Sequence, residues 1–481
     1  MAIIFIPLYI DYLGIEAYGL IGLFTVMQVF LNLLDMGISP TLGREMAKFK
    51  GGLHTIESIH DLLRSLEIII FSFAIFIALF IWSISDWLAS EWLLSENLAI
   101  SDIVKAISVS ALVIGLRFCE NIYRSAIIGL QEQVWFNTAF SILNTLRFGG
   151  AVLILAFVSS TISAFFYWQA VVSFLTISTY FIKLYKILPS SNRPARFSYE
   201  ALSKIWKFAG GILGINFLSI LLTQIDKVLL SHLLSLEYYG YYTLAGLLSG
   251  ILYLLVFPIR EALYPRMVEL YSKQDHEGFA SVYHLGSQLV TITTVPIMLV
   301  LAIYTEGLIY VWSGDLNLVT NAAPVLTVLI VGTFLNCLMG MPYQGQLAHG
   351  WTSLALKIDI IIVAFIIPAI FWFVPIYGAM AAASIWVIIN AVYVFIGIHI
   401  MHKRILIHEK WRWYINDILV PMFGATVILL VFKYTQPSLD ATRIEWSIFL
   451  LIVGMVALIS TIMLSNLYRP VLIKMINRFY S

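Results

Sequence analysis

Three charged side chains lie on one face of a strongly apolar stretch of the sequence, residues 105–128. Arg117, Glu120 and Arg124 are spaced i, i+3 and i+7, so an α-helix places them on one side, with Asn121 beside them. The planar guanidinium group of arginine matches the oxygens of phosphate groups. This spacing therefore predicts a polar stripe that holds an anion within an apolar helix.

A second polar stripe follows in the next apolar stretch, residues 136–158, which contains Asn144 and Arg147. Each charge at the centre of a membrane costs ~2.5–3.5 kcal/mol, so such side chains face a water-filled cavity or polar partners. We expect one substrate-binding group that combines the two stripes and consists of Arg117, Arg124, Arg147, Asn121 and Asn144.

Further charged groups are candidates for counter-charges or for coupling to an ion, namely Asp35, Glu120, Asp226 and Lys227. The last two also fit a salt bridge at the membrane rim. Two carboxylates accompany three arginines in the first half of the chain, and an excess of fixed cations favours an anionic cargo. The alternative is that Arg117–Glu120, and Asp35 with Arg124 or Arg147, are internal salt bridges that fix helix packing.

The segments that carry these residues are suited to lipid. The 481 residues are 60% hydrophobic and 11% charged, whereas soluble proteins have about 25% charged residues. Apolar windows of about 20 residues recur along the chain, without the alternation of a membrane β-barrel, so they indicate helices. We predict an all-α integral membrane protein with about 12–14 transmembrane helices.

These helices are expected to form two six-helix lobes around a central cavity, followed by a C-terminal helix pair. The longest polar connection, 183–207, is basic and contains Pro189 and Pro194. We predict an N-terminal lobe, a cytoplasmic linker, a second lobe, and a helix pair with a cytoplasmic tail, at residues 1–182, 183–207, 208–400 and 401–481. Residues 1–10 are about half of a span. We interpret them as the end of a first helix whose start is missing, or alternatively as an interfacial segment.

Lysine and arginine concentrate in alternate loops, near residues 44–64, 183–207, 260–273, 403–412 and 469–478. The opposite loops hold little more than Lys433 and Arg443. Because basic loops stay in the cytoplasm, this bias places the C-terminus inside. We expect a multi-pass membrane protein.

The sequence lacks the motifs of several enzyme classes. The nearest string to a phosphate-binding loop, 345–352, has Trp351 in place of the lysine, and His408-Glu409 lacks the second histidine of a zinc protease. The outer loops are short, and a net charge of +1 gives no field that attracts nucleic acid. We therefore predict that the protein is not an enzyme and that it uses no cofactor and no metal. Its energy source would be coupling to H⁺ or Na⁺, the membrane potential, or the removal of product.

Several strings resemble those of Wzx-type O-antigen and polysaccharide flippases, in the polysaccharide transport branch of the MOP exporter superfamily. PLYIDYLGIEAYGLIGLF (7–24) and LLDMGISPTLGREMAKFKGG (33–52) are similar to the opening of that family. TQIDKVLLSHLLSLEYYGYYTLA (223–245) is similar to the start of its second lobe, and FPIREALYPRM (257–267) and GQLAHGWTSLALKI (345–358) add matches in the same order.

This resemblance implies a two-lobed transporter with a central cavity and a cargo of undecaprenyl-pyrophosphate-linked oligosaccharide. It implies movement from the cytoplasmic to the periplasmic leaflet by alternating access, with cationic residues of the first lobe engaging the cargo. The implied partners are the polyprenyl-pyrophosphate-linked glycan, membrane lipid and the glycan polymerase of the same pathway. The alternatives are an ion-coupled exporter of the multidrug type, which would favour an acidic cavity, and a membrane glycan polymerase, which would need a large periplasmic loop.

Overall fold

The computed structural model describes residues 2–35, 38–191, 193–199, 202, 221, 223–351, 353–438 and 440–470. Within these residues the chain forms helices and connecting turns, and its only extended pairing is an isolated bridge between Leu94 and Ser235. The prediction of an all-α protein is therefore confirmed. Residues 203–220, which belong to the expected linker and seventh span, and the tail 471–481 lie outside the described residues.

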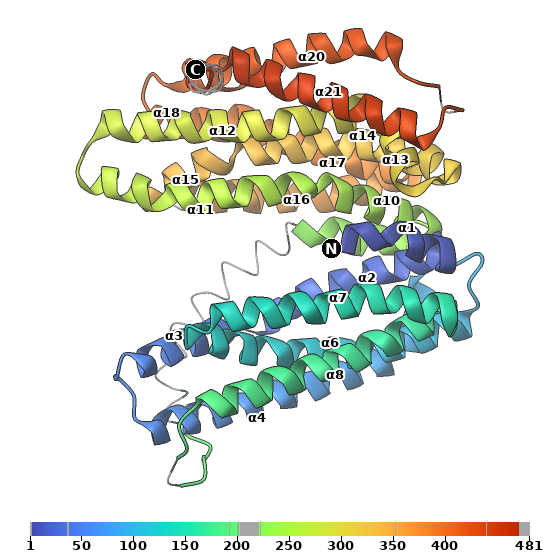
Figure 1. Cartoon of the computed structure of the whole chain (residues 1–481), viewed down its shortest axis with the longest axis vertical. Coiled ribbons are helices and arrows are strands. Elements are labelled where there is room, and N and C mark those ends of the chain that lie inside the picture. The colour runs from blue at the N-terminus through green and yellow to red at the C-terminus, as the bar shows by residue number, and fades with distance from the viewer. Residues whose placement is uncertain are drawn as a thin grey trace, which may run out of the picture. The chain divides into compact units, whose positions relative to one another are not determined.

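The described chain divides into two compact units, Met1–Gly240 and Tyr241–Ser481. Most helices of the first unit are blue to green in Figure 1. They are α1 (Ala2–Leu13), α2 (Ile15–Leu34), α3 (Ile38–Lys50), α4 (Ile56–Ser83), α5 (Ser85–Trp87), η1 (Leu88–Trp92), α6 (Ile100–Gly129), α7 (Gln133–Phe157) and α8 (Ile162–Ile187), together with the helical residues 223–233.

Local signals explain where several of these helices begin and end. Gly14 separates α1 from α2 and has a φ of 81°, a conformation that costs glycine little. Thr55 precedes α4, and its hydroxyl accepts a hydrogen bond from the backbone N–H of Ser58, which satisfies one of the free donors of the first turn. Gly14 and Thr55 therefore mark helix boundaries, one through its backbone conformation and the other through its side-chain hydrogen bond.

Helix α6 is the centre of the first unit. It packs against α4 and α8 most extensively, and also against α2, α3 and α7. Its apolar face buries residues such as Ile114, Phe118 and Ile122. Because α6 contacts so many neighbours, polar groups on its remaining face are held at a defined position among them.

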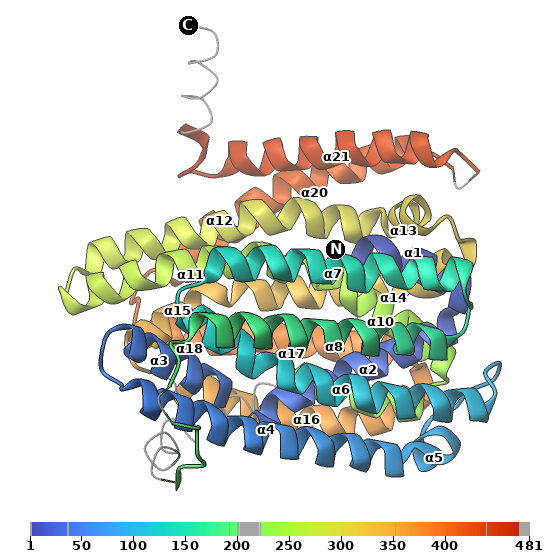
Figure 2. The same cartoon turned by 60° about the horizontal axis from the view of Figure 1, so that its bottom comes forward.

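The second unit surrounds helix α12, which packs against α11, α14, α15, α20 and α21. In Figure 2, α20 and α21 run side by side next to α12. The helices are α10 (Leu236–Ser249), which crosses the division between units, α11 (Ile251–Ser272), α12 (His276–Ile303), α13 (Thr305–Ser313), α14 (Leu316–Leu338), α15 (Gly340–Ala348), α16 (Ser353–Tyr377), α17 (Ala379–Val392), η2 (Tyr393–Gly397), α18 (Ile398–Arg404), α19 (Lys410–Arg412), η3 (Trp413–Leu419), α20 (Val420–Phe432), η4 (Lys433–Thr435) and α21 (Arg443–Leu464).

Ten helical stretches of the described chain are long and apolar enough to cross a membrane. They begin at Ile56 and end at Leu464, and shorter apolar helices cover Ile3–Leu13 and Ile15–Phe30. Helix α6 is not one of the ten, although it spans 30 residues, about 45 Å of helix. Helix α6 carries the predicted polar stripe, and these polar residues make it one of the least apolar of the long helices.

Two boundaries differ from those expected from the sequence. The linker was expected to begin at residue 183, but α8 continues to Ile187, because Leu184 is buried and Lys183 pairs with Glu132 at 2.9 Å. The division between compact units falls at Gly240 rather than within 183–207. Residues 223–240 contact the loop after η1, since the N–H of Leu236 donates to the carbonyl oxygen of Leu94 at 2.7 Å.

Candidate functional site

Helices α6, α7 and α8 surround a small pocket in the first unit, with about 330 Å³ of empty space. The pocket unites five of the residues predicted from spacing with aromatic and hydroxyl groups from the same helices. The lining residues are Glu120, Asn121, Arg124, Phe140, Leu143, Asn144, Arg147, Thr176 and Tyr180. The helical periodicity of α6 and α7 therefore brings four of the five expected substrate-binding residues to one place, whereas Arg117, on the same helix α6, does not line this pocket.

Arg147 and Glu120 form an ion pair across the wall of this pocket. The Nη2 atom of Arg147 lies 2.8 Å from Oε1 of Glu120, and the two side chains are 10% and 14% exposed. The same Nη2 atom lies 3.4 Å from both Ser173 Oγ and Thr176 Oγ1 on α8. This pair therefore links three helices and neutralises the arginine that is most deeply buried.

Arg117 is held differently, by neutral side chains. Its Nη1 atom donates to Gln28 Oε1 at 2.7 Å, and its Nη2 atom donates to Gln169 Oε1 at 2.6 Å. The ring of Phe24 lies 5.1 Å from the guanidinium carbon, within the range of a cation–π contact. Among the described residues no carboxylate pairs with Arg117, and its buried Nε atom has no hydrogen-bond partner. Amide dipoles therefore orient this positive charge without neutralising it.

Arg124 is exposed at the pocket and lies over two aromatic rings. Its guanidinium carbon is 5.5 Å from the ring centre of Phe136 and 6.0 Å from that of Phe140. Asn144 donates within its own helix, to the carbonyl oxygen of Phe140 at 2.8 Å. A solvent-accessible guanidinium beside a partly exposed amide offers hydrogen-bond donors to a ligand that enters the pocket.

The salt bridges considered from the sequence are not the ones that form. Glu120 pairs with Arg147 rather than with Arg117. Asp35 accepts hydrogen bonds from Ser39, at 2.6 Å from its hydroxyl and 3.2 Å from its N–H, close to the start of α3. In this structure Asp35 therefore caps the first turn of a helix, where free backbone donors need an acceptor.

Asp226 and Lys227 lie in the helical residues 223–233 and do not line the arginine pocket. The Nζ atom of Lys227 donates to the carbonyl oxygen of Thr223 at 3.3 Å and to Gln224 Oε1 at 3.1 Å. The structure thus joins Arg124 of α6 and Arg147 of α7 in one pocket but does not bring Asp226 and Lys227 to it.

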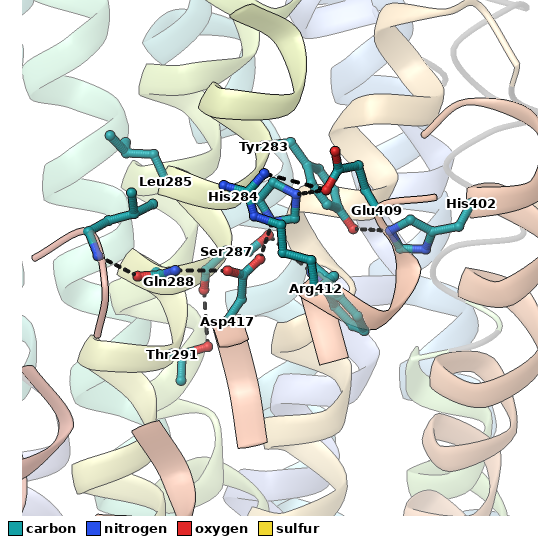
Figure 3. Close-up of polar contacts among 12 residues, drawn as sticks. Tyr283, His284, Leu285, Ser287, Gln288, Thr291, His402, Glu409, Arg412 and Asp417 are labelled. Carbon is teal, nitrogen blue, oxygen red and sulfur yellow. Dashed lines mark hydrogen bonds and ion pairs between the residues drawn. The ribbon is translucent and has the colours of Figure 1, made fainter. Parts of the chain in front are cut away.

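A second buried polar group was missed by the sequence analysis. In the second unit, His284 of α12 lies between Asp417 of η3 and Glu409, as Figure 3 shows. The two carboxylates lie 125 and 133 residues away from the histidine in the sequence. No short spacing connects them, so a motif search does not detect the group; the only signals were single polar residues in apolar segments.

A family model described as a polysaccharide biosynthesis protein matches residues 12–316. The chain belongs to this family. The match covers most of the chain and includes every helix that contributes to the arginine pocket. The residues that match the family therefore include the candidate site. The predicted resemblance to polysaccharide flippases is confirmed.

Known relatives and structures agree with this assignment. A Shigella flexneri protein described as an O-antigen transporter is 22% identical over 379 residues, which are 78% of this chain and 87% of that protein. The structure of the lipid II flippase MurJ in an inward closed conformation has a TM-score of 0.68 and 14% identity, and covers 98% of this chain and 97% of that one. An inward-facing multidrug resistance MATE family transporter of the MOP superfamily has a TM-score of 0.65 and 14% identity, and covers 84% of this chain and 95% of that one. This family member is therefore a multi-pass membrane protein, and the proteins that it resembles are transporters and flippases.

Proposed function

We propose that this transporter flips undecaprenyl-pyrophosphate-linked oligosaccharide, an O-antigen or similar repeat unit, from the cytoplasmic to the periplasmic leaflet. The observation that carries this proposal is the state of Arg117, a guanidinium in the middle of the 30-residue helix α6 that has hydrogen-bond partners but no ion pair among the described residues. A charge in that position is costly unless a ligand or water balances it. A pyrophosphate provides the missing negative charge.

The chemistry of the pocket supports an anionic head group. Arg124 lines the pocket beside the neutralised pair Arg147–Glu120, and Arg117 lies outside the pocket on the same helix, so the candidate group as a whole carries net positive charge. Guanidinium groups bind phosphate oxygens with two parallel hydrogen bonds. In this mechanism Arg117 and Arg124 contact the pyrophosphate, and Arg147 is oriented by Glu120 until cargo competes for it. Asn121 and Asn144 donate to phosphate or sugar oxygens.

We infer alternating access because the two parts of the cargo need different surroundings. The charged sugar head needs a polar path, whereas the polyprenyl tail is stable in lipid, so the head moves through the protein while the tail remains outside. Asp35, Glu120, Asp226 and Lys227 are the proposed counter-charges or coupling groups for H⁺ or Na⁺. The proposed location is the bacterial inner membrane, and the basic loops support a cytoplasmic C-terminus. The glycan polymerase of the pathway is the proposed recipient of the product.

Surface polysaccharide in a deletion strain tests this proposal. Complementation with the intact gene should restore the polymer on a gel, whereas Arg117→Gln should leave lipid-linked intermediate inside the cell with the protein still inserted. Arg117→Lys keeps the charge but loses the fork, and should restore export in part. Arg266→Gln is the matched control, because Arg266 is an exposed arginine that pairs with Glu269 on α11.

The outcomes separate the candidate functions. Wild-type polymer in the Arg117→Gln strain would contradict the site, and unchanged polymer after deletion in a strain without a second flippase would contradict the function. Drug sensitivity of the same strains tests export of small molecules, which the deletion should leave unchanged.

A further inference from the structure

His284 is enclosed in the second unit with a carboxylate at each nitrogen of its ring. Its Nδ1 atom lies 2.5 Å from Asp417 Oδ2, and its Nε2 atom lies 2.9 Å from Glu409 Oε2. Figure 3 shows the three side chains in this order, and we call them the carboxylate–histidine cluster. The side chains of His284 and Asp417 are both 0% exposed. This arrangement is costly in an apolar interior unless hydrogen bonds and opposite charges compensate for it.

The segment from 408 to 419 is shaped to deliver these carboxylates. Glu409, Trp413 and Asp417 are four residues apart, and all three contact α12, because Trp413 Nε1 donates to Ser287 Oγ at 3.0 Å. Asp417 belongs to the π-helical segment η3, a distortion that is frequent at functional positions. His408 precedes Glu409 with a φ of 74°, a left-handed conformation that is uncommon outside glycine. The backbone therefore adopts two uncommon conformations in the segment that carries the carboxylates of the cluster.

The two contacts of the imidazole require two protons. A neutral histidine has one N–H group, so it can donate to only one of two ionised carboxylates. At both observed distances a hydrogen bond needs its own proton, carried either by the imidazole as a cation or by one carboxyl group. Removal of one proton would leave a nitrogen lone pair facing a carboxylate oxygen. The contact between α12 and the segment 409–417 therefore depends on a bound proton.

The neighbouring histidine provides a contrast within the same figure. His402 Nδ1 faces the carbonyl oxygen of Ile398 at 2.9 Å, so this nitrogen carries the hydrogen. Its Nε2 atom lies 3.1 Å from the hydroxyl of Tyr283 and accepts from it. A neutral ring satisfies both contacts. His402 is therefore a buried histidine, 2% exposed, that needs no additional proton.

The cluster reaches from the protein surface to the interior. Glu409 is 27% exposed and lies 3.5 Å from the half-exposed Arg412, which gives the buried pair a route to water. On the inner side, Gln288 Nε2 donates to Asp417 Oδ1 at 2.9 Å, and Gln288 Oε1 accepts from the hydroxyl of Ser465 at 2.5 Å. Hydrogen bonds through Gln288 therefore link Asp417 of η3 to Ser465, which follows α21.

Charged and titratable groups around the cluster come from α12, α18, α19, η3 and the residues after α21. They are Tyr283 on α12, His402 on α18, Lys410 and Arg412 on α19, Tyr414 on η3 and Tyr468 after α21. Lys410 lies over the rings of Trp411 and Tyr414, and Arg412 contacts only the outer carboxylate, Glu409. None of the ion pairs of the described residues places a lysine or arginine on Asp417. Among these ion pairs, the ring of His284 is therefore the partner that Asp417 has, and the bound proton is what joins the two side chains.

We propose that the carboxylate–histidine cluster is a proton-binding site whose occupancy holds α20 and α21 on α12. The proton exchanges with water through Glu409, on the side of the basic loop 403–412. Release of the proton weakens the attachment of the two C-terminal helices. This site regulates the helix pair whatever cargo the first unit binds, so it is testable without cargo.

Hydrogen-exchange mass spectrometry of the full-length protein in lipid nanodiscs tests the proposal. Protection of the peptides that cover 410–435 and 443–464 should fall as pH rises, after correction for intrinsic exchange. Release of one proton changes the attachment equilibrium by up to about tenfold per pH unit. His284→Gln should give low protection with no such pH dependence, and His402→Gln, the matched buried control, should keep the wild-type profile.

Two results would overturn the proposal: a wild-type protein without pH-dependent protection, or a His284→Gln protein with the wild-type profile. If His284→Gln does not accumulate, Glu409→Gln gives the decision, because Glu409 lies at the surface end of the cluster. Loss of its charge should shift the profile to lower pH, and an unshifted profile contradicts the site. Failure of these tests leaves the glycan-export experiment unaffected, since no cargo is present.

Discussion

The guanidinium of Arg117 meets the side-chain oxygen of Gln169 at 2.6 Å, so a neutral amide fixes the position of a full positive charge. Gln169 is 1% exposed and comes from α8, while Gln28 supports the other nitrogen from α2. Carboxylates in these positions would hold the arginine equally well but would cancel its charge. Two glutamines therefore orient the arginine and leave its charge free for an anion.

Gln169→Glu tests this interpretation directly. The new carboxylate should pair with Arg117 in almost unchanged geometry, so the protein should accumulate with a thermal midpoint no lower than that of wild type. Export of surface polysaccharide should nevertheless fall by about tenfold or more, because a charge-assisted contact to the cargo is worth ~1.5–3 kcal/mol. Gln133→Glu is the control, since Gln133 is exposed at the start of α7. Normal export by Gln169→Glu would show that the charge of Arg117 is not used.

The pair Arg147–Glu120 should behave in the opposite way, as a determinant of stability. Glu120→Gln leaves a buried guanidinium without its counter-charge, and loss of one partner from a buried pair costs about 3–5 kcal/mol. The double variant Glu120→Gln/Arg147→Gln should recover most of this loss, because no isolated charge remains. Thermal unfolding followed by size-exclusion chromatography measures both effects. Glu269→Gln, in the exposed pairs of α11, should cause no measurable loss.

Equal losses in the single and double variants would mean that the pair is not coupled. In that case the contribution of Glu120 would come from its other contacts in the pocket rather than from the charge of Arg147.

Helical periodicity explains why much of the first-unit site was predictable. Arg124 and Asn121 lie on one face of α6, and Asn144 and Arg147 lie on one face of α7, so local spacing was sufficient to group them. Their hydrogen-bond partners were not predictable, because the choice between Asp35, Glu120 and an amide depends on how three helices pack. Apolar windows likewise revealed the long spans but not the division at Gly240.

The carboxylate–histidine cluster shows the limit more clearly. The chain that carries Glu409 and Asp417 contains a π-helical segment, η3, and begins after a left-handed residue, His408. Neither feature has a periodic signal in the sequence. A single histidine in an apolar span is weak evidence unless its partners are known, and here they lie more than a hundred residues away.

Arg124 should contribute less to export than Arg117. Its guanidinium is exposed over Phe136 and Phe140, and a cation–π contact at an exposed site is worth ~0.5–1 kcal/mol. Arg124→Gln should therefore lower export by about two- to fivefold, and Arg124→Lys should lower it less. Quantitative gels of surface polysaccharide from matched expression levels give the comparison. A loss as large as that of Arg117→Gln would instead identify Arg124 as the principal phosphate contact.

Glu16 makes a last, independent prediction about the loop that follows η1. Its carboxylate accepts hydrogen bonds from the backbone N–H groups of Glu96, Asn97 and Leu98, at 3.0, 3.1 and 3.0 Å, and it is 5% exposed. Glutamine offers one oxygen acceptor and places an amide N–H group near these donors, so at least one donor loses its partner. The cost of a buried unsatisfied donor is ~1–3 kcal/mol.

Glu16→Gln should therefore lower the thermal midpoint and speed hydrogen exchange at residues 94–98, whereas Glu91→Gln, at an exposed position just before this loop, should change neither. Leu94 of the same loop and Trp92 at the end of η1 both contact the segment 223–240. The ring nitrogen of Trp92 lies 3.1 Å from Ser231 Oγ. Faster exchange should extend to residues 231–236 if Glu16 holds the loop in the position that makes these contacts. Faster exchange in the loop alone would mean that Trp92 and Leu94 keep their partners without it.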